Sequence, residues 1–370
     1  MISAQRLPAS LTPLDAALAA VLRDVAPVTP VELPLTEALH CIAAEMPPLR
    51  AHPPHDVATF DGWAMRANDL VGASSYAPLP LAAPPVWVEA GSAMPAGTDC
   101  VVDADAVDIS GPLAQVLTEA IPGQGVRRAG SDIAEGRPLT EAGQPVRPRD
   151  LLLAHTAGLA TLRVRRPQLR MVNIPGGGVT VPFIAETARL AGADVTRTEA
   201  PGRDAAAIAA TLDARGCDLL ITIGGGGVGR SDATVAALAA RGEVIAHGIA
   251  LQPGRTAAVG RIETTPVIAL PGATDQAFAA WWALALPVLD RLSGRRTRQT
   301  QALPLARKIA SSVGIAEVAL LMCQQGSWTT LAIGDLSLDA IARADALLIV
   351  PGSAEGFAAE TVVDAYMLRE

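Results

Sequence analysis

The chain has 370 residues, of which half are hydrophobic and 18% are charged, and its formal net charge is −8. This composition excludes an intrinsically disordered protein, and the length exceeds one ordinary hydrophobic core, so we expect several domains. The negative charge argues against nucleic acid as a partner. The 4 cysteines are widely spaced and form no CxxC pair, which argues against a zinc knuckle and against a disulfide framework.

The sequence has no pattern typical of a targeting or membrane segment. The first 13 residues lack the apolar core of a signal peptide. The most apolar predicted helix begins at Ala277, is 13 residues long and contains Pro287, so it is too short to span a bilayer. We therefore expect a cytoplasmic protein without a membrane partner.

The predicted elements, taken in chain order, change character several times. Residues 12–25 and 36–46 are predicted helices, and residues 150–159 form a third. Short β-like runs separated by Gly and Pro precede the third helix and return near the C-terminus. We therefore expect an α/β multidomain protein. Its predicted parts are a helical linker domain (residues 1–45 and 140–168), a small β-rich domain (46–139), a three-layer α/β domain (169–295) and a C-terminal β-barrel (300–370).

The α/β domain is predicted from apolar strand-length runs that alternate with helical patterns. This alternation is typical of a parallel sheet with right-handed crossovers, whose ligands bind at the carboxyl ends of the strands. Five loops are expected to meet at that edge of the sheet. They are residues 173–178, 200–204, 224–232, 252–256 and 271–275.

The loop 224–232 is the most informative of the five. It follows a buried-strand run, contains four consecutive glycines and leads into a helical pattern that ends at Gly242. A strand, a glycine loop and a helix start together present bare backbone N–H groups to an anionic ligand. Asp232 is unusual there, because its carboxylate would repel a phosphate unless it binds a metal ion, handles a proton or caps the helix.

Two nucleotide-binding motifs almost fit this loop. Its glycines spell GxGxxG with Glu243 nearby, and they also spell a P-loop in which Arg230 replaces the lysine. An arginine does not easily replace the compact lysine charge of a P-loop, and Glu243 is expected to begin a strand. We therefore expect NAD(P) and ATP to bind weakly or not at all. A tight strand-to-helix turn without a ligand remains the simplest alternative.

Six short motifs, in a fixed order, resemble those of one protein family. FDGWAMR (60–66) is similar to MDGYAxR, AGSAMPAGTDCVV (90–102) to TGAxxPxGxDAVV, RRAGSDI (127–133) to RxxGEDI, GGGGVGRSD (224–232) to GGVSxGxxD, LQPGRT (251–256) to KPGKP, and LPGAT (270–274) to LPGNP. Each motif alone is weak, but together they resemble the MoeA family of molybdopterin molybdotransferases, which includes the gephyrin E domain. The resemblance covers essentially the whole chain.

The resemblance implies an elongated homodimer with its active site between subunits. Such an enzyme inserts molybdate into adenylylated molybdopterin and releases AMP, with Mg²⁺ as the divalent cation. A molybdenum enzyme or another cofactor-biosynthesis protein would be a further partner. Carried over by position, the catalytic acids are Asp61, Asp132, Asp204 and Asp232, and the cation ligands are Asp204 and Asp232. The residues implied to bind the pterin or phosphate are Gly224, Gly225, Gly226, Gly227, Gly229, Ser231, Pro253, Gly254, Arg255, Pro271 and Gly272.

The chain also departs from the family motifs. The family's STGDEL loop is replaced by residues 173–178, so both of its acids are absent, and Gln252 and Arg255 stand where the family has lysines. Two hypotheses therefore remain. The four retained acids favour an active molybdotransferase, whereas the lost loop acids favour a non-catalytic protein that binds or carries molybdopterin or the finished cofactor.

Overall fold

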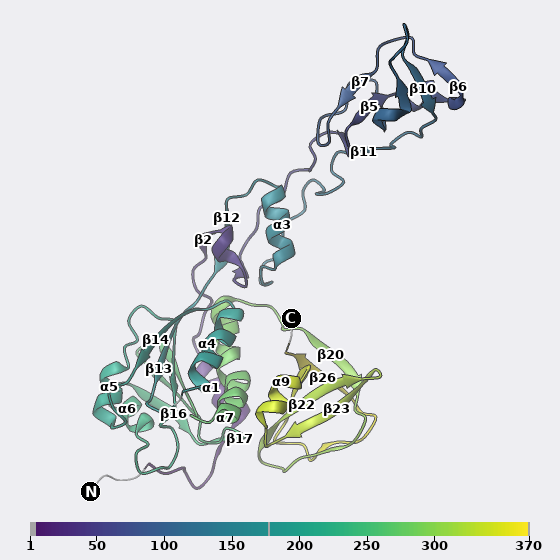
Figure 1. The fold of residues 1–370 in the computed structure, drawn as a ribbon. Coiled ribbons are helices and arrows are strands. Elements are labelled where there is room, and N and C mark those ends of the chain that lie inside the picture. The colour runs from purple at the N-terminus through teal and green to yellow at the C-terminus, as the bar shows by residue number, and fades with distance from the viewer. Residues whose placement is uncertain (1–4, 177, 369–370) are drawn as a thin grey trace. The chain divides into compact units, whose positions relative to one another are not determined.

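The computed structural model describes residues 5–176 and 178–368 (Figure 1). Contacts divide the chain into two compact units. The large unit comprises Met1–Glu45, Ala142–Arg147 and Thr161–Glu370, and the small unit comprises Met46–Glu141 and Pro148–Ala160. The four-part division expected from the sequence is finer than this and stays a prediction.

The large unit contains a six-stranded sheet whose first four strands are parallel, as predicted. The connection from Ile262 to Thr265 holds only two residues, so the strands on either side of it pair in opposite directions. The sheet is therefore mixed. Its strands lie in the order β14 (Asp194–Glu199), β13 (Gln168–Asn173), β15 (Leu219–Ile223), β19 (Thr265–Leu270), β18 (Ala258–Ile262) and β16 (Glu243–His247), with β18 antiparallel to both of its neighbours.

Helices cover both faces of this sheet, so the predicted three layers are present (Figure 1). Successive side chains of a strand point to opposite faces. Accordingly, Leu219 and Ile221 pack into one apolar core, whereas Leu220 packs into the other. The first core is formed with α1 (Leu14–Leu22), α4 (Thr180–Leu190), α7 (Thr274–Ala280) and α8 (Leu286–Ser293), and the second with α5 (Ala205–Thr211) and α6 (Thr234–Arg241).

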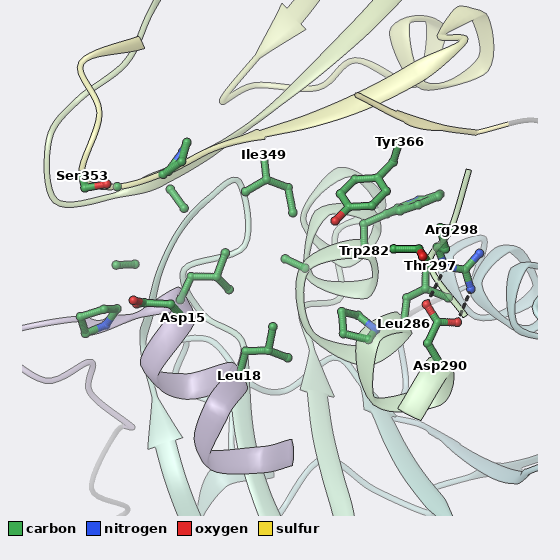
Figure 2. A pocket seen from close by; sticks show the side chains of 18 of the residues that line it. Asp15, Leu18, Trp282, Leu286, Asp290, Thr297, Arg298, Ile349, Ser353 and Tyr366 are labelled. Atoms are coloured by element: carbon green, nitrogen blue, oxygen red, sulfur yellow. Dashed lines mark hydrogen bonds and ion pairs between the residues drawn. The ribbon is translucent and has the colours of Figure 1, made fainter. Parts of the chain in front are cut away.

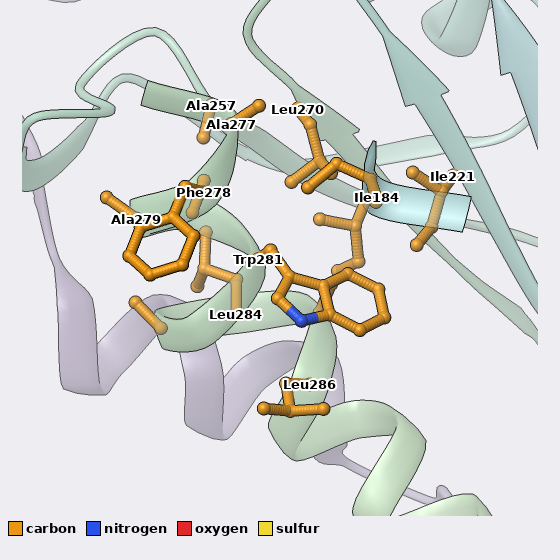
Figure 3. Packing of buried hydrophobic residues seen from close by; sticks show 14 of the residues in the cluster. Ile184, Ile221, Ala257, Leu270, Ala277, Phe278, Ala279, Trp281, Leu284 and Leu286 are labelled. Atoms are coloured by element: carbon orange, nitrogen blue, oxygen red, sulfur yellow. The ribbon is translucent and has the colours of Figure 1, made fainter. Parts of the chain in front are cut away.

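The closing helix predicted for residues 273–290 is interrupted. A π-helical segment, Trp281–Ala285, joins α7 to α8. Pro287 has no N–H to donate to the carbonyl four residues earlier, so the regular helical hydrogen-bond ladder is interrupted before it, in the π-helical segment. Trp281 belongs to this segment, and its side chain is fully buried among Ile184, Leu284 and their neighbours (Figure 3).

A second sheet of the large unit joins the C-terminal residues to the α/β domain through β17. Among the described residues, its named strand pairs run from β1 to β20, and an isolated bridge joins Leu305, just after β20, to Trp328. The C-terminal β-barrel stays a prediction. The order is β1 (Thr12–Pro13), β17 (Ile249–Gln252), β22 (Ala316–Gln324), β24 (Ala346–Val350), β26 (Val362–Met367) and β20 (Thr300–Pro304), with β23 (Ser327–Ile333) on β22; α9 (Leu338–Arg343), β21 (Ile309–Ala310) and β25 (Gly356–Phe357) complete this region.

The helix predicted for residues 36–46 is wrong in most of its length. The helix α2 (Leu35–Ala38) has only one turn, because His40 adopts a positive φ of 65° and the next residues form β3 (Ile42–Ala43). Strand β3 pairs with β12 (Thr161–Arg165), which also pairs with β2 (Val31–Pro34). A pairing partner about 120 residues away thus overrides the local helical pattern.

The small unit has the predicted β-rich character. Gly62 permits close pairing of two of its strands, because a Cβ at this position would lie 2.2 Å from the carbonyl oxygen of Val102. In both units, no helix within the described ranges combines the length and apolarity needed to cross a membrane. The elements of the small unit are β4 (Val57–Ala58), β5 (Gly62–Met65), β6 (Ser74–Pro80), β7 (Val86–Val88), β8 (Cys100–Val102), β9 (Val107–Asp108), β10 (Gln115–Thr118), β11 (Val126–Arg127) and α3 (Pro148–Thr156), with 3₁₀ turns at Ala67–Leu70 and Ala104–Ala106.

Candidate functional site

A polar cavity lies at the carboxyl edge of the six-stranded sheet, where the sequence predicted the ligand. Its volume is about 410 Å³, and we call it the glycine cavity. Segments that follow β13, β14, β15 and β19 all contribute to it. Its lining residues are Ile174, Gly176, Arg203, Gly224, Gly225, Gly226, Gly227, Asp232, Thr256, Pro271, Gly272, Ala273 and Gln276.

A second, larger cavity of the large unit lies elsewhere, beside α1 and α8 (Figure 2). Its volume is about 760 Å³ and its lining is mostly apolar. Asp290 lines this cavity. Its Oδ2 accepts a 2.7 Å hydrogen bond from Nε of Arg298, and its Oδ1 accepts a 2.7 Å hydrogen bond from Nη2 of the same arginine. The glycine cavity is the better candidate for chemistry, because polar groups from several loops converge on it.

The backbone carbonyls of the four consecutive glycines each have a hydrogen-bond partner that does not line the cavity. Thr234 contributes two of these bonds: its Oγ1 donates to the oxygen of Gly224 over 2.9 Å, and its N–H donates to that of Gly225 over 3.0 Å. The Nε2 atom of His247 lies 3.0 Å from the oxygen of Gly226. Because a carbonyl oxygen can only accept, this ring nitrogen carries the proton. The fourth carbonyl, of Gly227, accepts a 2.7 Å bond from Nε2 of Gln5.

This arrangement determines where the N–H groups of the loop point. In a trans peptide the N–H of one residue points away from the C=O of the residue before it. The N–H groups of residues 225–228 therefore point away from Thr234, His247 and Gln5, none of which lines the glycine cavity. Within the described ranges, none of these four N–H groups donates to another residue. The loop is thus a set of backbone donors that is open to an anion.

Two positions of this loop require glycine. Gly225 has a positive φ of 68°, and a Cβ there would lie 2.4 Å from Oγ1 of Thr234. At Gly227 a Cβ would lie 2.6 Å from Oδ2 of Asp232. A side chain at either position would collide with a group that shapes the loop.

An ion pair spans the cavity between the second and third loops. Nη2 of Arg203 lies 3.1 Å from Oδ1 of Asp232, and Nε of Arg203 donates to Oγ of Ser231 over 3.3 Å. Nη1 of Arg203 also donates to the carbonyl oxygen of Pro175. The other carboxylate oxygen of Asp232 accepts a 2.9 Å bond from the N–H of Gly229. Both side chains are therefore oriented by partners on more than one loop.

The structure gives Asp204 and Asp232 roles that are unlike each other. Asp204 is exposed and caps α5, since its Oδ1 accepts a 3.0 Å bond from the N–H of Ala207. Asp232 does not cap α6. The N-cap residue of that helix is Ala233, which makes no side-chain capping hydrogen bond. Of the two acids, Asp232 is therefore the one that lines the cavity.

The remaining predicted ligand residues of the large unit lie on two further loops. Pro253, Gly254 and Arg255 form the turn after β17, in which Gly254 has a φ of 121° and the side chain of Arg255 is exposed. Neither this turn nor Ser231 lines the cavity directly, although Ser231 contacts Arg203. Pro271 and Gly272, by contrast, line the cavity after β19.

Asp61 and Asp132 belong to the small unit, where both have partners. Oδ1 of Asp61 accepts a 2.7 Å bond from the N–H of Ala90, and Oδ2 of Asp132 lies 3.2 Å from Nη1 of Arg127. The neighbouring Asp56 accepts hydrogen bonds from the N–H of Ala129 and from Arg128, which lower the pKa of its carboxyl group. Asp61 and Asp132 thus belong to the small unit, whereas the glycine loop belongs to the large unit. Their joint action with the loop stays a prediction.

The donors in the large unit do not fit the predicted Mg²⁺ site. A protein site for Mg²⁺ offers free carboxylate oxygens in near-octahedral geometry. Asp232 is committed to Arg203 and to the N–H of Gly229, and Asp204 is committed to its helix cap. Within residues 5–176 and 178–368, no group of three or more His, Cys, Asp or Glu side chains could hold a metal ion. Mg²⁺ binding stays a prediction, and the contacts of Asp204 and Asp232 do not support it.

Sequence reasoning missed four residues that shape this site: Arg203, Thr234, His247 and Gln5. A threonine near the predicted helix start, two residues after Asp232, is a local signal, and Arg203 lies in a loop already predicted to reach the site. Neither Gln5 nor His247 carries a comparable signal, because each reaches the loop from a distant part of the chain. Glu243, in contrast, begins β16 as predicted.

A glycine loop of this kind, at the carboxyl edge of a three-layer α/β domain, is typical of proteins that bind an anionic ligand through backbone N–H groups. Two family models match the chain: the MoeA N-terminal region (domain I and II) over residues 12–158, and a probable molybdopterin binding domain over residues 179–291. The chain belongs to the MoeA family, as the resemblance of its motifs indicated.

The similar proteins extend over most of the chain. It is 29% identical to molybdopterin molybdenumtransferase 2 of Mycobacterium tuberculosis, over 92% of this chain and 95% of that protein. It is 28% identical to molybdopterin molybdenumtransferase of Haemophilus influenzae, over 71% and 73%. The crystal structure of the molybdopterin biosynthesis moeA protein from Pyrococcus horikoshii superposes with a TM-score of 0.70 at 20% identity, over 97% of this chain and 100% of that one. The last comparison concerns the fold alone.

Proposed function

We propose that this protein is a molybdopterin molybdenumtransferase of molybdenum cofactor biosynthesis, which inserts molybdate into adenylylated molybdopterin and releases AMP. The observation that carries the proposal is the run of four glycines, whose carbonyls are all hydrogen-bonded while the N–H groups of residues 225–228 stay open. Such donors suit the phosphate of an anionic pterin and can stabilise the charge that develops as a phosphoanhydride breaks.

The proposed binding surface extends beyond the loop itself. Gly229 and Ser231 complete the loop, Pro271 and Gly272 line the cavity beside Gly224, and the exposed guanidinium of Arg255 is available to a phosphate. We further propose a cytoplasmic homodimer in which Asp61 and Asp132 of one subunit reach the glycine cavity of the other. Their proposed role is to guide the attacking water to the phosphoanhydride.

A carrier function is the second candidate, and one observation favours it. The loop after β13 contains Ile174, Pro175 and Gly176 and no acid, so that part of the cavity offers no general base. A protein that binds molybdopterin without cleaving the adenylate would need only the N–H groups of the glycine loop. The two functions therefore differ in turnover and not in ligand.

The deciding experiment uses the full-length purified protein. Molybdate-dependent release of AMP from adenylylated molybdopterin is measured together with pterin binding, and a strain that lacks its own molybdotransferase is tested for complementation. We expect AMP release and complementation. Pterin binding without AMP release would establish the carrier function, and absence of both activities would contradict the proposal as a whole.

Asp232→Asn is expected to lower AMP release by about 10²-fold, which corresponds to roughly 2.7 kcal/mol. The amide cannot both neutralise Arg203 and accept from Gly229, so the loop and the guanidinium lose their common anchor. The matched variant is Asp204→Asn, which makes the same chemical change at a helix cap, where asparagine serves nearly as well. Steady-state AMP release by both variants checks this. Equal rates for Asp232→Asn and the wild type would contradict the prediction.

A further inference from the structure

We propose that Arg203 makes the glycine cavity an oxyanion site that needs no divalent cation. In this inference the guanidinium is a built-in counter-charge for Asp232 and a donor to the bound anion. The identity of the anion, the phosphate of a pterin, rests on the proposed function. The assignment of Arg203 rests on the contacts of the cavity itself.

The first step concerns position. Arg203 reaches the cavity from the segment after β14 and bonds to two other loops. Its partners are Pro175 on the loop after β13, and Ser231 and Asp232 on the loop after β15. A guanidinium held by three partners is oriented before any ligand arrives. It is therefore a fixed part of the site.

The second step concerns charge. Arg203 and Asp232 are the two charged side chains that line the cavity among the described residues. The side chain of Asp232 is only 16% exposed, so its negative charge is poorly screened by water. Without Arg203 the cavity would carry a net negative charge and repel an anion. A divalent cation would then be needed to neutralise Asp232. With Arg203 the pair is neutral.

The third step concerns donors. A guanidinium has five N–H groups, and the bonds to Ser231, Pro175 and Asp232 use three of them. Two N–H groups of Arg203 remain, in addition to the backbone N–H groups of residues 225–228. Charge-assisted and backbone donors together can replace the solvation shell of a phosphate oxygen. The cavity thus supplies both the charge balance and the hydrogen bonds that oxyanion binding requires.

The test is calorimetric titration of the full-length protein with two probes, inorganic phosphate and molybdopterin released from a purified molybdenum enzyme. Each titration is run with excess EDTA and with excess MgCl₂. We expect the wild type to bind both probes with dissociation constants that agree within about twofold between the two conditions. Arg203→Met should weaken both probes by at least about tenfold, since a hydrogen bond to a charged group is lost.

The matched control is Arg215→Met. Arg215 also forms an arginine–aspartate ion pair, 3.0 Å from Asp213, but it lies before β15, at the opposite edge of the sheet from the cavity. This variant should bind both probes as the wild type does. Arg203→Lys keeps the charge and should lose less affinity for both probes than Arg203→Met. If circular dichroism shows that the methionine variant is unfolded, the affinity of Arg203→Lys relative to the wild type tests the role of Arg203 instead.

Three results would overturn the inference: phosphate binding by the wild type that weakens at least tenfold in EDTA, an Arg203→Met variant that matches Arg215→Met, or no phosphate binding by the wild type. Failure of the proposed function has a different signature. In that case phosphate binds as expected and depends on Arg203, whereas molybdopterin does not bind and no AMP is released.

Discussion

Gly225→Ala is expected to reduce AMP release by about 10²-fold or more, which is the loss typical when an oxyanion donor is removed. The added Cβ would lie 2.4 Å from Oγ1 of Thr234, well inside van der Waals contact. Relief of this clash must displace Thr234, whose hydroxyl and N–H hold the carbonyls of Gly224 and Gly225. Release of these carbonyls lets the N–H groups of residues 225 and 226 turn away from the anion.

The chain offers a matched control for this variant in Gly216→Ala. Gly216 has a positive φ of 70°, close to the 68° of Gly225, but a Cβ there would have no atom within 4 Å. Both alanines therefore cost about 1–2 kcal/mol of left-handed backbone strain, and only Gly225→Ala adds a collision. Steady-state AMP release and melting temperature separate the two effects. Similar AMP release by the two variants would refute the role assigned to the loop.

Trp281→Ala is expected to lower the free energy of unfolding by about 3–5 kcal/mol. The side chain of Trp281 is fully buried where α7 and α8 meet the sheet, within the core that α1, α4 and the strands share (Figure 3). A cavity left by the indole would border rigid elements on several sides, so the surroundings can collapse only partly. Urea unfolding followed by circular dichroism measures the change.

Trp281→Phe separates the effect of volume from that of the indole N–H. Nε1 of Trp281 is buried and has no hydrogen-bond partner among the described residues, so the tryptophan already has one unpaired polar group. Phenylalanine removes that group and retains most of the ring. We expect it to cost less than about 1.5 kcal/mol. A cost for Trp281→Phe equal to that of Trp281→Ala would show that packing around the ring does not control stability here.

The strand–glycine–helix unit could be predicted from sequence because its signals are local. The buried run of β15, the four glycines after it and the helix that begins at Thr234 are all contained in about 25 consecutive residues. The alternation of strands and helices likewise predicted the parallel part of the sheet and the edge where the cavity lies. Patterns of period two and 3.6 report which face of an element is buried, and need no knowledge of its neighbours.

One expectation failed where distant pairing outweighs local pattern, and a second stays a prediction. Residues 36–46 have helical periodicity, yet β3 pairs with β12, and only one turn of helix remains. The C-terminal strands have the lengths and turns of the predicted small barrel, and β22 also pairs with β17 of the α/β domain, which no local pattern indicated. Such pairings depend on the register and the free edges of strands that no local window contains.

The sequence by itself determined the layered α/β architecture, the glycine loop at its edge and the resemblance to the MoeA family. Tertiary structure decided what makes that loop a site: Gln5 holds a carbonyl of a residue 222 positions away, and Arg203 holds an acid 29 positions away. The physical reason is that hydrogen bonds and ion pairs act over about 3 Å in space, whereas sequence patterns report only which face of an element is buried. Side chains from separate elements meet within that distance only once the sheet and its helices have packed together.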